Sequence, residues 1–131
     1  MIVDQEKKLD YFMQDDKGIF AGLHMILDLY EVDKLDDLNW IKTGLIGAAK
    51  IANANILHTH MHHFGINQGI SGVVVLSESH ISVHSWPESR YMALDVFMCG
   101  KTDPEKAVKF LINYFAAGRY NLSRQRRGDL V

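Results

Sequence analysis

Residues 69–98 read GISGVVVLSESHISVHSWPESRYMALDVFM and contain three strand-like segments in direct succession. The first, residues 69–76, includes a continuous apolar run that is typical of a well-buried strand. The second and third, residues 80–85 and 91–98, lie on either side of a turn at Pro87. Strands that follow one another so closely are typical of an antiparallel sheet.

Further strands and two helices are expected on both sides of this stretch. We predict strands at residues 19–30, 56–63 and 120–123, a helix at residues 33–53, and a second helix capped by Asp103 with Pro104 at its first position. Residues 1–17 are polar and predict a loosely held arm. With no linker or repeat, residues 1–131 are expected to form a single α+β domain. The predicted architecture is a two-layer sandwich with an antiparallel sheet and both helices on one face.

The last of the three strands has two different faces. Alternation places one uniformly apolar set toward the helices, namely Met92, Leu94, Val96 and Met98. It places a mixed set on the other face, namely Tyr91, Ala93, Asp95, Phe97 and Cys99. A mixed and uncovered sheet face indicates a site or an interface, and we therefore predict a homodimer.

Composition limits the possible function classes. The chain has 131 residues, is 47% hydrophobic and carries a formal net charge of -2, which is typical of a globular protein. That charge argues against a nucleic-acid partner, and the basic group Arg124, Arg126 and Arg127 is attributed to a solvated terminal segment. No apolar run is long enough for a membrane span or a secretory signal, and one cysteine gives no internal disulfide. We therefore expect a cytoplasmic protein without a membrane partner.

The segment at residues 69–88, followed by DVFMCG at residues 95–100, resembles the S-adenosylmethionine decarboxylase family in its short prokaryotic form. Weaker likeness extends to GLH at residues 22–24, YEVD at residues 30–33 and RG at residues 127–128. The resemblance implies a self-cleaving, pyruvoyl-dependent decarboxylase that serves spermidine synthesis. It also implies a homodimer whose active sites lie at the subunit junction.

The resemblance assigns the self-cleavage to Ser79, whose hydroxyl attacks the carbonyl of Glu78. The resulting ester is broken by β-elimination, which leaves fragments 1–78 and 79–131 and turns Ser79 into the pyruvoyl cofactor. His84 and Ser71 match the processing residues of the family, and an imidazole has the right chemistry to move a proton near neutral pH. From the residues alone, a structural or solvent-facing role for either side chain stays open.

The same resemblance assigns the residues that handle the substrate. The pyruvoyl group takes the substrate amine as a Schiff base and acts as an electron sink. Cys99 matches the proton donor, although a lone cysteine is often an inert buried residue. Glu88 matches the glutamate that binds the ribose hydroxyls, and an exposed turn residue is the alternative reading.

One departure from the family pattern concerns the base of the substrate. The family has an aromatic ring fourteen positions before the cleavage serine, where this chain has Gly65. Phe64 could stack on the adenine instead, and stacking on a base is worth about 1–3 kcal/mol. The departure keeps open the alternative that the same chemistry acts on ornithine or arginine. A non-catalytic α+β binding or dimerisation module is a further and separate alternative.

Three alternating histidines, His58, His60 and His62, are expected on one face of a strand. Three imidazoles could hold zinc. No carboxylate stands out in the sequence to orient them, so we expect them to line a wet sheet face or a subunit contact. We predict no metal site.

Overall fold

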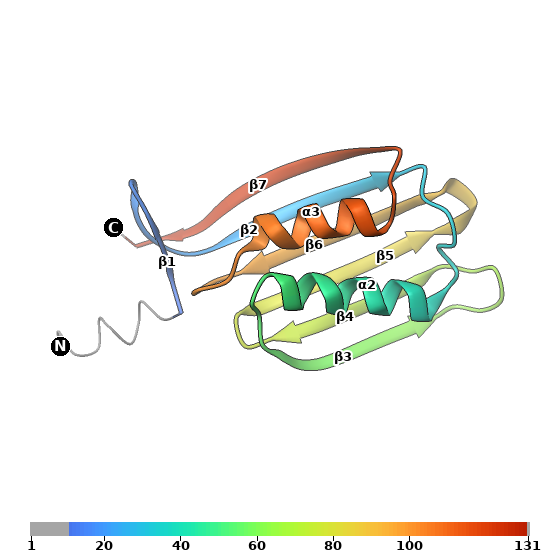
Figure 1. The fold of residues 1–131 in the computed structure, drawn as a ribbon, viewed down its shortest axis with the longest axis horizontal. Helices are drawn as coiled ribbons and strands as arrows, with labels where there is room; N and C mark the ends of the chain where they lie inside the picture. Colours follow the sequence, from blue (N-terminus) through green and yellow to red (C-terminus); the bar gives the residue numbers. More distant parts are fainter. Residues whose placement is uncertain (1–10, 131) are drawn as a thin grey trace.

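The computed structural model describes residues 11–130, in which one antiparallel sheet carries two helices (Figure 1). The elements in chain order are β1 (Met13–Asp15), β2 (Gly18–Tyr30), α2 (Leu38–Ile51), β3 (Ile56–His63), β4 (Ile70–Leu76), β5 (Ser79–Trp86), a 3-10 turn (Pro87–Ser89), β6 (Tyr91–Met98), α3 (Pro104–Tyr114) and β7 (Arg119–Asp129). The sheet order is β1-β2-β6-β5-β4-β3, and β7 pairs with β2. Every pairing is antiparallel, as the succession of strands predicts.

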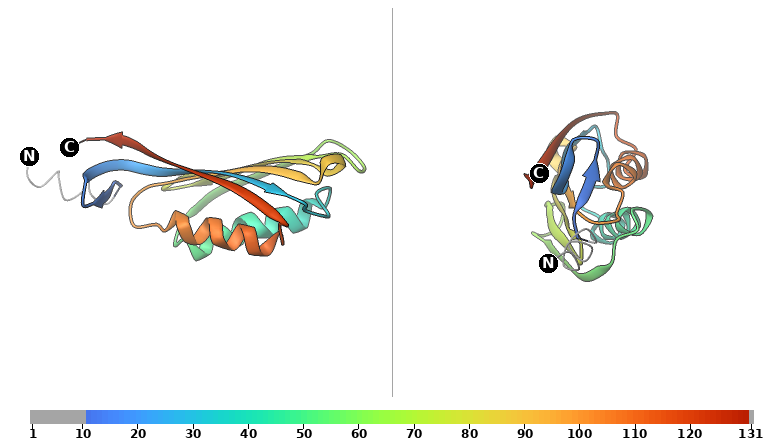
Figure 2. Two further views of the ribbon diagram at one scale, coloured as in Figure 1. Left: turned by 90° about the horizontal axis from the view of Figure 1, so that it is seen from above. Right: turned by 90° about the vertical axis from the view of Figure 1, so that its left-hand side faces the viewer.

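Both helices cover the same face of the sheet, and no described helix lies on the other face (Figure 2). The predicted two-layer α+β sandwich is therefore confirmed. We call the uncovered side the open face. Of the helices within residues 11–130, none combines the length and the apolar character needed to cross a membrane.

The two faces of β6 have the characters predicted from alternation. Met92, Val96 and Met98 are 0% exposed beneath the helices, and Leu94 is 3% exposed. Burying such a side chain contributes about 1.5–3 kcal/mol. Asp95, Phe97 and the other residues of the opposite face are partly exposed. The core thus lies between sheet and helices, and the mixed set is left on the open face.

The first helix begins later than the periodicity predicts. Residues 33–53 were expected to be helical, whereas α2 starts at Leu38. Asp37 is its N-cap, and its carboxylate accepts a hydrogen bond from the Trp40 amide at 3.1 Å. Lys34 has a φ of 60°, which a helix does not allow, so the residues before Asp37 form a loop. The second helix begins as predicted, with Asp103 as cap and Pro104 first.

The two ends of the described chain are more ordered than predicted. The last strand was expected at residues 120–123, but β7 spans Arg119–Asp129 along β2. As an edge strand it is largely exposed on both sides, so its sequence lacks the alternation that would predict a strand. The expected loose arm is wrong for β1 (Met13–Asp15), which pairs with β2. Residues 1–10 of that arm lie outside the described residues.

Candidate functional site

The turn between β4 and β5 holds a strained peptide. Leu76 and Ser79 are directly paired, so Ser77 and Glu78 are the two residues of the turn. Ser79, the first residue of β5, has a φ of 131°, a conformation that residues with a side chain rarely adopt. Such a conformation costs about 1–3 kcal/mol and persists only when the surrounding structure enforces it.

Contacts from the residue that follows β6 and from the loop before β3 hold this turn. The Cys99 amide donates a hydrogen bond to the Glu78 carbonyl oxygen at 3.0 Å, and the Asn55 amide donates to Glu78 Oε1 at 2.9 Å. Ser79 Oγ lies 4.0 Å from Cys99 Sγ. An amide that donates to a carbonyl oxygen stabilises the negative charge that would develop there if a nucleophile attacked the carbon.

Cys99 is the free thiol of this group and is partly buried. Burial raises the pKa of Cys99, the contact with Ser79 opposes that shift, and the charge of Glu78 adds to it. The net effect is a pKa above the ordinary thiol value. The thiol is therefore protonated at neutral pH and can give a proton rather than act as a thiolate.

A second group of predicted residues surrounds a cavity at the other end of β4 and β5. Ser71 and His84 are cross-strand neighbours, and Ser71 Oγ lies 2.8 Å from His84 Nδ1. Both line a cavity of about 340 Å³, together with Phe64, Trp86 and Glu88. The cavity thus combines a hydroxyl–imidazole pair, a carboxylate and two aromatic rings.

The cavity lining distinguishes Phe64 from Gly65, the two positions considered for contact with the adenine base. Phe64 lines the cavity, and its ring packs against that of His62 with centroids 4.6 Å apart. Gly65 is not among the lining residues and has a φ of 139°, which favours glycine. The aromatic side chain on this loop is therefore displaced by one position from where the family pattern places it.

The structure does not bring the two groups together within one chain. Ser79 is the first residue of β5, and His84 is five positions further along the strand. At about 3.3 Å per residue, five positions correspond to about 16 Å. Glu78, Ser79 and Cys99 therefore form one group, whereas Ser71, His84 and Glu88 belong to the other.

The three alternating histidines lie on β3 as predicted, with His58, His60 and His62 all exposed. Their strand partners are Val75, Val73 and Ser71 on β4. The described residues contain a tighter group of potential metal ligands elsewhere, formed by His24, His80 and Asp95. The prediction that β3 holds no metal stays a prediction.

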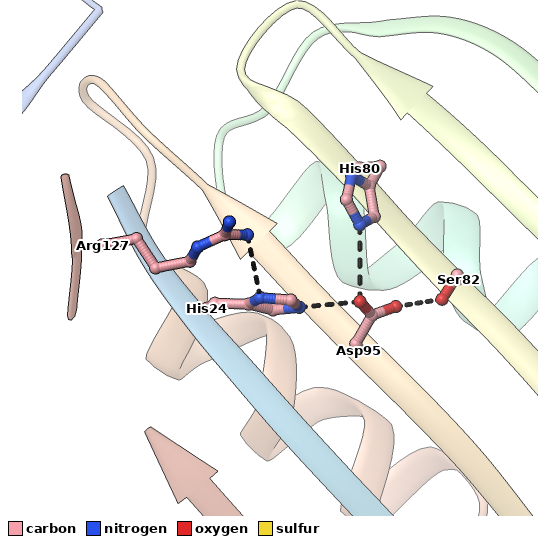
Figure 3. A network of polar contacts seen from close by, with 5 residues as sticks. All are labelled: His24, His80, Ser82, Asp95 and Arg127. Carbon is pink, nitrogen blue, oxygen red and sulfur yellow. Dashed lines mark hydrogen bonds and ion pairs between the residues drawn. The ribbon is translucent and has the colours of Figure 1, made fainter. Parts of the chain in front are cut away.

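The tighter group was not predicted from the sequence (Figure 3). Asp95 Oδ2 lies 2.7 Å from His24 Nε2 and 3.4 Å from His80 Nε2, and Asp95 Oδ1 accepts a hydrogen bond from Ser82. Burial alone would raise the pKa of Asp95, but the hydrogen bonds from Ser82 and His24, together with the charge and hydrogen bond of His80, leave the pKa below its ordinary value. Asp95 is therefore ionised at neutral pH.

The strand register, which the sequence does not show, brings this group together. His24 and Asp95 are 71 positions apart in the chain. They become neighbours because β2 pairs with β6. Phe97 is directly opposite His24, and Asp95 lies two positions before Phe97 on β6. The one available signal was the position of Asp95 among the mixed residues of β6, which marks it as a polar side chain on the open face.

Comparison with known proteins identifies the family. A family model described as S-adenosylmethionine decarboxylase matches residues 23–128. An S-adenosylmethionine decarboxylase proenzyme of Prochlorococcus marinus (strain MIT 9211) is 45% identical over 113 residues, covering 84% of this chain and 92% of the relative. A protein with the same name from Synechococcus sp. (strain WH7803) is 50% identical over 94 residues, covering 70% of this chain and 73% of the relative.

A solved structure agrees with these sequence matches. The crystal structure of the adenosylmethionine decarboxylase from Aquifex aeolicus VF5 superimposes with a TM-score of 0.78 at 37% sequence identity. The match covers 86% of this chain and 94% of that one. Sequence and fold therefore agree over most of both chains, and this chain belongs to the S-adenosylmethionine decarboxylase family.

Proposed function

We propose that this chain is a precursor that cleaves itself between Glu78 and Ser79 and then decarboxylates S-adenosylmethionine, which supplies aminopropyl groups for spermidine synthesis. The observation that carries the proposal is the strained Ser79, with its φ of 131°. It lies beside the Glu78 carbonyl, whose oxygen accepts a hydrogen bond from the Cys99 amide. The relatives named as proenzymes support it.

The self-cleavage uses the atoms of the β4–β5 turn. The Ser79 hydroxyl attacks the Glu78 carbonyl carbon, its proton passes to the amide nitrogen of Ser79, and the peptide bond becomes an ester. Loss of the proton from Cα of Ser79 then breaks the Oγ–Cβ bond and releases Glu78 as a new carboxyl end. The resulting dehydroalanine hydrolyses to a pyruvoyl group and ammonia. The Cys99 amide is placed to stabilise the oxyanion of the first step.

A serine needs a base to act at neutral pH, and we assign that base to His84 of a second copy of the chain. Within one chain His84 is about 16 Å along β5 from Ser79. If two copies pack their open faces together about a two-fold axis, the cleavage turn of each can meet the Ser71–His84 pair of the other. Apolar side chains exposed on the open face, Ile26, Val75 and Trp86, support such a homodimer.

The mature centre divides its tasks among the same residues. The pyruvoyl group, once formed at position 79, supplies the electron sink for decarboxylation. The protonated thiol of Cys99, 4.0 Å from Ser79 Oγ, is the donor that returns a proton to the substrate carbon. We assign the ribose hydroxyls to Glu88 and the adenine to Phe64, which both line the cavity. Gly65 supplies the backbone turn beside them.

The test is a measurement of cleavage and turnover on one preparation. Mass spectrometry under denaturing conditions should give fragments 1–78 and 79–131, the second without a free amino end. Carbon dioxide release should occur with S-adenosylmethionine and not with ornithine or arginine. Release from an amino acid alone would transfer the same chemistry to that substrate. A chain that stays intact and inactive would leave a non-catalytic binding module.

The single domain, the cytoplasmic location and the absence of nucleic-acid and membrane partners stay predictions.

A further inference from the structure

We propose that Asp95 is a positioning residue for self-cleavage, which it serves by drawing donors from β2 and β5 onto β6 beside the strained turn. The inference rests on the proposed function. It concerns the network in Figure 3, which lies outside both groups of residues assigned above. The network joins four strands, because Arg127 of β7 approaches His24 of β2, which contacts Asp95, which in turn contacts His80 of β5.

The carboxylate is well suited to hold neighbouring strands together. Asp95 is ionised and 25% exposed, and it receives hydrogen bonds from His24, His80 and Ser82. Hydrogen bonds to a charged acceptor are about twice as strong as those between neutral groups. The three donors come from the strands on either side of β6, so Asp95 fixes the β2–β6 and β5–β6 contacts at one point.

That point lies next to the residues of the cleavage site. His80 directly follows Ser79 on β5, and its strand partner is Phe97, two positions before Cys99 on β6. The rings of His24 and His80 both pack against Phe97, with centroids 5.2 Å and 6.0 Å from it. Fixing the His80 ring therefore restrains the backbone that leaves Ser79, and a strained φ requires such restraint.

The same three ligands could in principle hold a metal, but the surroundings favour a hydrogen-bonded network. The Arg127 guanidinium can only donate, and it lies 3.4 Å from His24 Nδ1. Nδ1 is then the acceptor nitrogen, so Nε2 carries the ring proton and donates it to Asp95. A metal on Nε2 would displace that proton and place two positive groups side by side.

The experiment follows the cleavage rate from the moment of synthesis in a cell-free reaction, using full-length chains. Asp95→Asn should cleave about 10- to 100-fold more slowly than the wild type, because the charged acceptor is lost. The matched control is Asp28→Asn. Asp28 is another open-face carboxylate, and it accepts a hydrogen bond from Tyr91 at 2.5 Å near the far end of the sheet. This control should cleave at the wild-type rate.

A pair of substitutions at His80 separates positioning from proton transfer. The amide of His80→Gln can still donate to Asp95 from nearly the position of Nε2, whereas His80→Leu cannot. Cleavage should be retained in His80→Gln and slowed in His80→Leu, even if Asp95→Asn fails to fold. Circular dichroism and thermal unfolding report whether each variant is folded.

Four results would overturn the inference. They are wild-type cleavage in folded Asp95→Asn, equal slowing in Asp28→Asn, equal slowing in His80→Gln and His80→Leu, and slowing of the wild type by a chelator. Failure of the proposed function looks different, because the wild-type chain itself would then stay intact.

Discussion

The two ends of β5 carry different groups. At its first residue lies Ser79, in a strained conformation beside the Cys99 amide and thiol. Toward its far end lies His84, within hydrogen-bond distance of Ser71. The first end has a nucleophile and a polarised carbonyl but no base assigned to it. The second end has an imidazole, a carboxylate at Glu88 and a cavity of about 340 Å³, but no peptide to cleave. Each end therefore lacks what the other holds.

This difference suggests that the open face is where two copies of the chain pair. A sheet that spaces the two groups about 16 Å apart cannot join them by a side-chain rotation. A two-fold pairing of two sheets can join them, and it forms two equivalent sites at once. The strained turn and the cavity can thus be tested separately, because a chain with a defect at one end and a chain with a defect at the other should complement each other in a mixed dimer.

The largest effect is expected from Ser79→Ala, which removes the nucleophile. The chain should stay intact, and decarboxylation should fall to background because no pyruvoyl group can form. Mass spectrometry and carbon dioxide release measure the two losses. Ser77→Ala, in the same turn, is the control and should cleave normally. Fragments in the Ser79→Ala protein would remove the strained turn from the mechanism.

The next effect separates the two ends between two chains. His84→Ala alone should remain uncleaved, because no base reaches Ser79 in either site of its dimer. Co-expression with Ser79→Ala chains should restore cleavage of the His84→Ala chain, since its Ser79 then meets His84 of the other subunit. Chains tagged with different masses show which one is cut. Failure of restoration in isolated mixed dimers would place the base within the chain that is cut.

Cys99→Ser should affect turnover more than cleavage. The Ser79 and Glu78 atoms remain in place, whereas the proton donor becomes a weaker acid, so kcat should fall about 100- to 10,000-fold. Because burial raises the pKa of Cys99, the wild-type thiol stays protonated past its ordinary value, and the alkaline loss of kcat should begin only above that value. Cys99→Ser should lack this loss between neutral and strongly alkaline pH. A pH profile of kcat on fully cleaved protein measures the difference, and an unchanged profile would assign proton donation to another group.

At the Ser79 end of β5, the sequence predicted the sheet and the face of Cys99, but not the backbone geometry of Ser79 or the network around Asp95. Alternation in β6 places Cys99 on the mixed face, and the succession of short strands predicts the antiparallel sheet. The φ of Ser79 depends on the closure of a two-residue turn and has no signature in the sequence. The network around Asp95 was missed because His24 is 71 positions away and becomes a neighbour only through strand register.

The far end shows the same limit in another form. The resemblance implied a base-stacking position at Gly65 and left open whether Phe64 would take that role. Where the Phe64 ring lies depends on the loop geometry: Gly65 has a φ of 139°, and the Phe64 ring lines the cavity. Likewise β7 was predicted too short, because an edge strand exposed on both sides needs no apolar alternation.

The smallest expected effect tests the cavity through that ring. Phe64→Ala should leave cleavage intact, because the phenyl ring neither carries nor accepts a proton in that step, and should raise KM for S-adenosylmethionine. Stacking of about 1–3 kcal/mol corresponds to a rise of about 5- to 150-fold. Ile66→Ala is the matched control, since Ile66 is on the same loop, 88% exposed and not among the cavity-lining residues. If both variants raise KM equally, the loop acts as a whole and the ring has no stacking role. If KM rises for Phe64→Ala alone while kcat is kept, the ring contributes binding energy to the substrate and the cavity end of the open face is the nucleoside end.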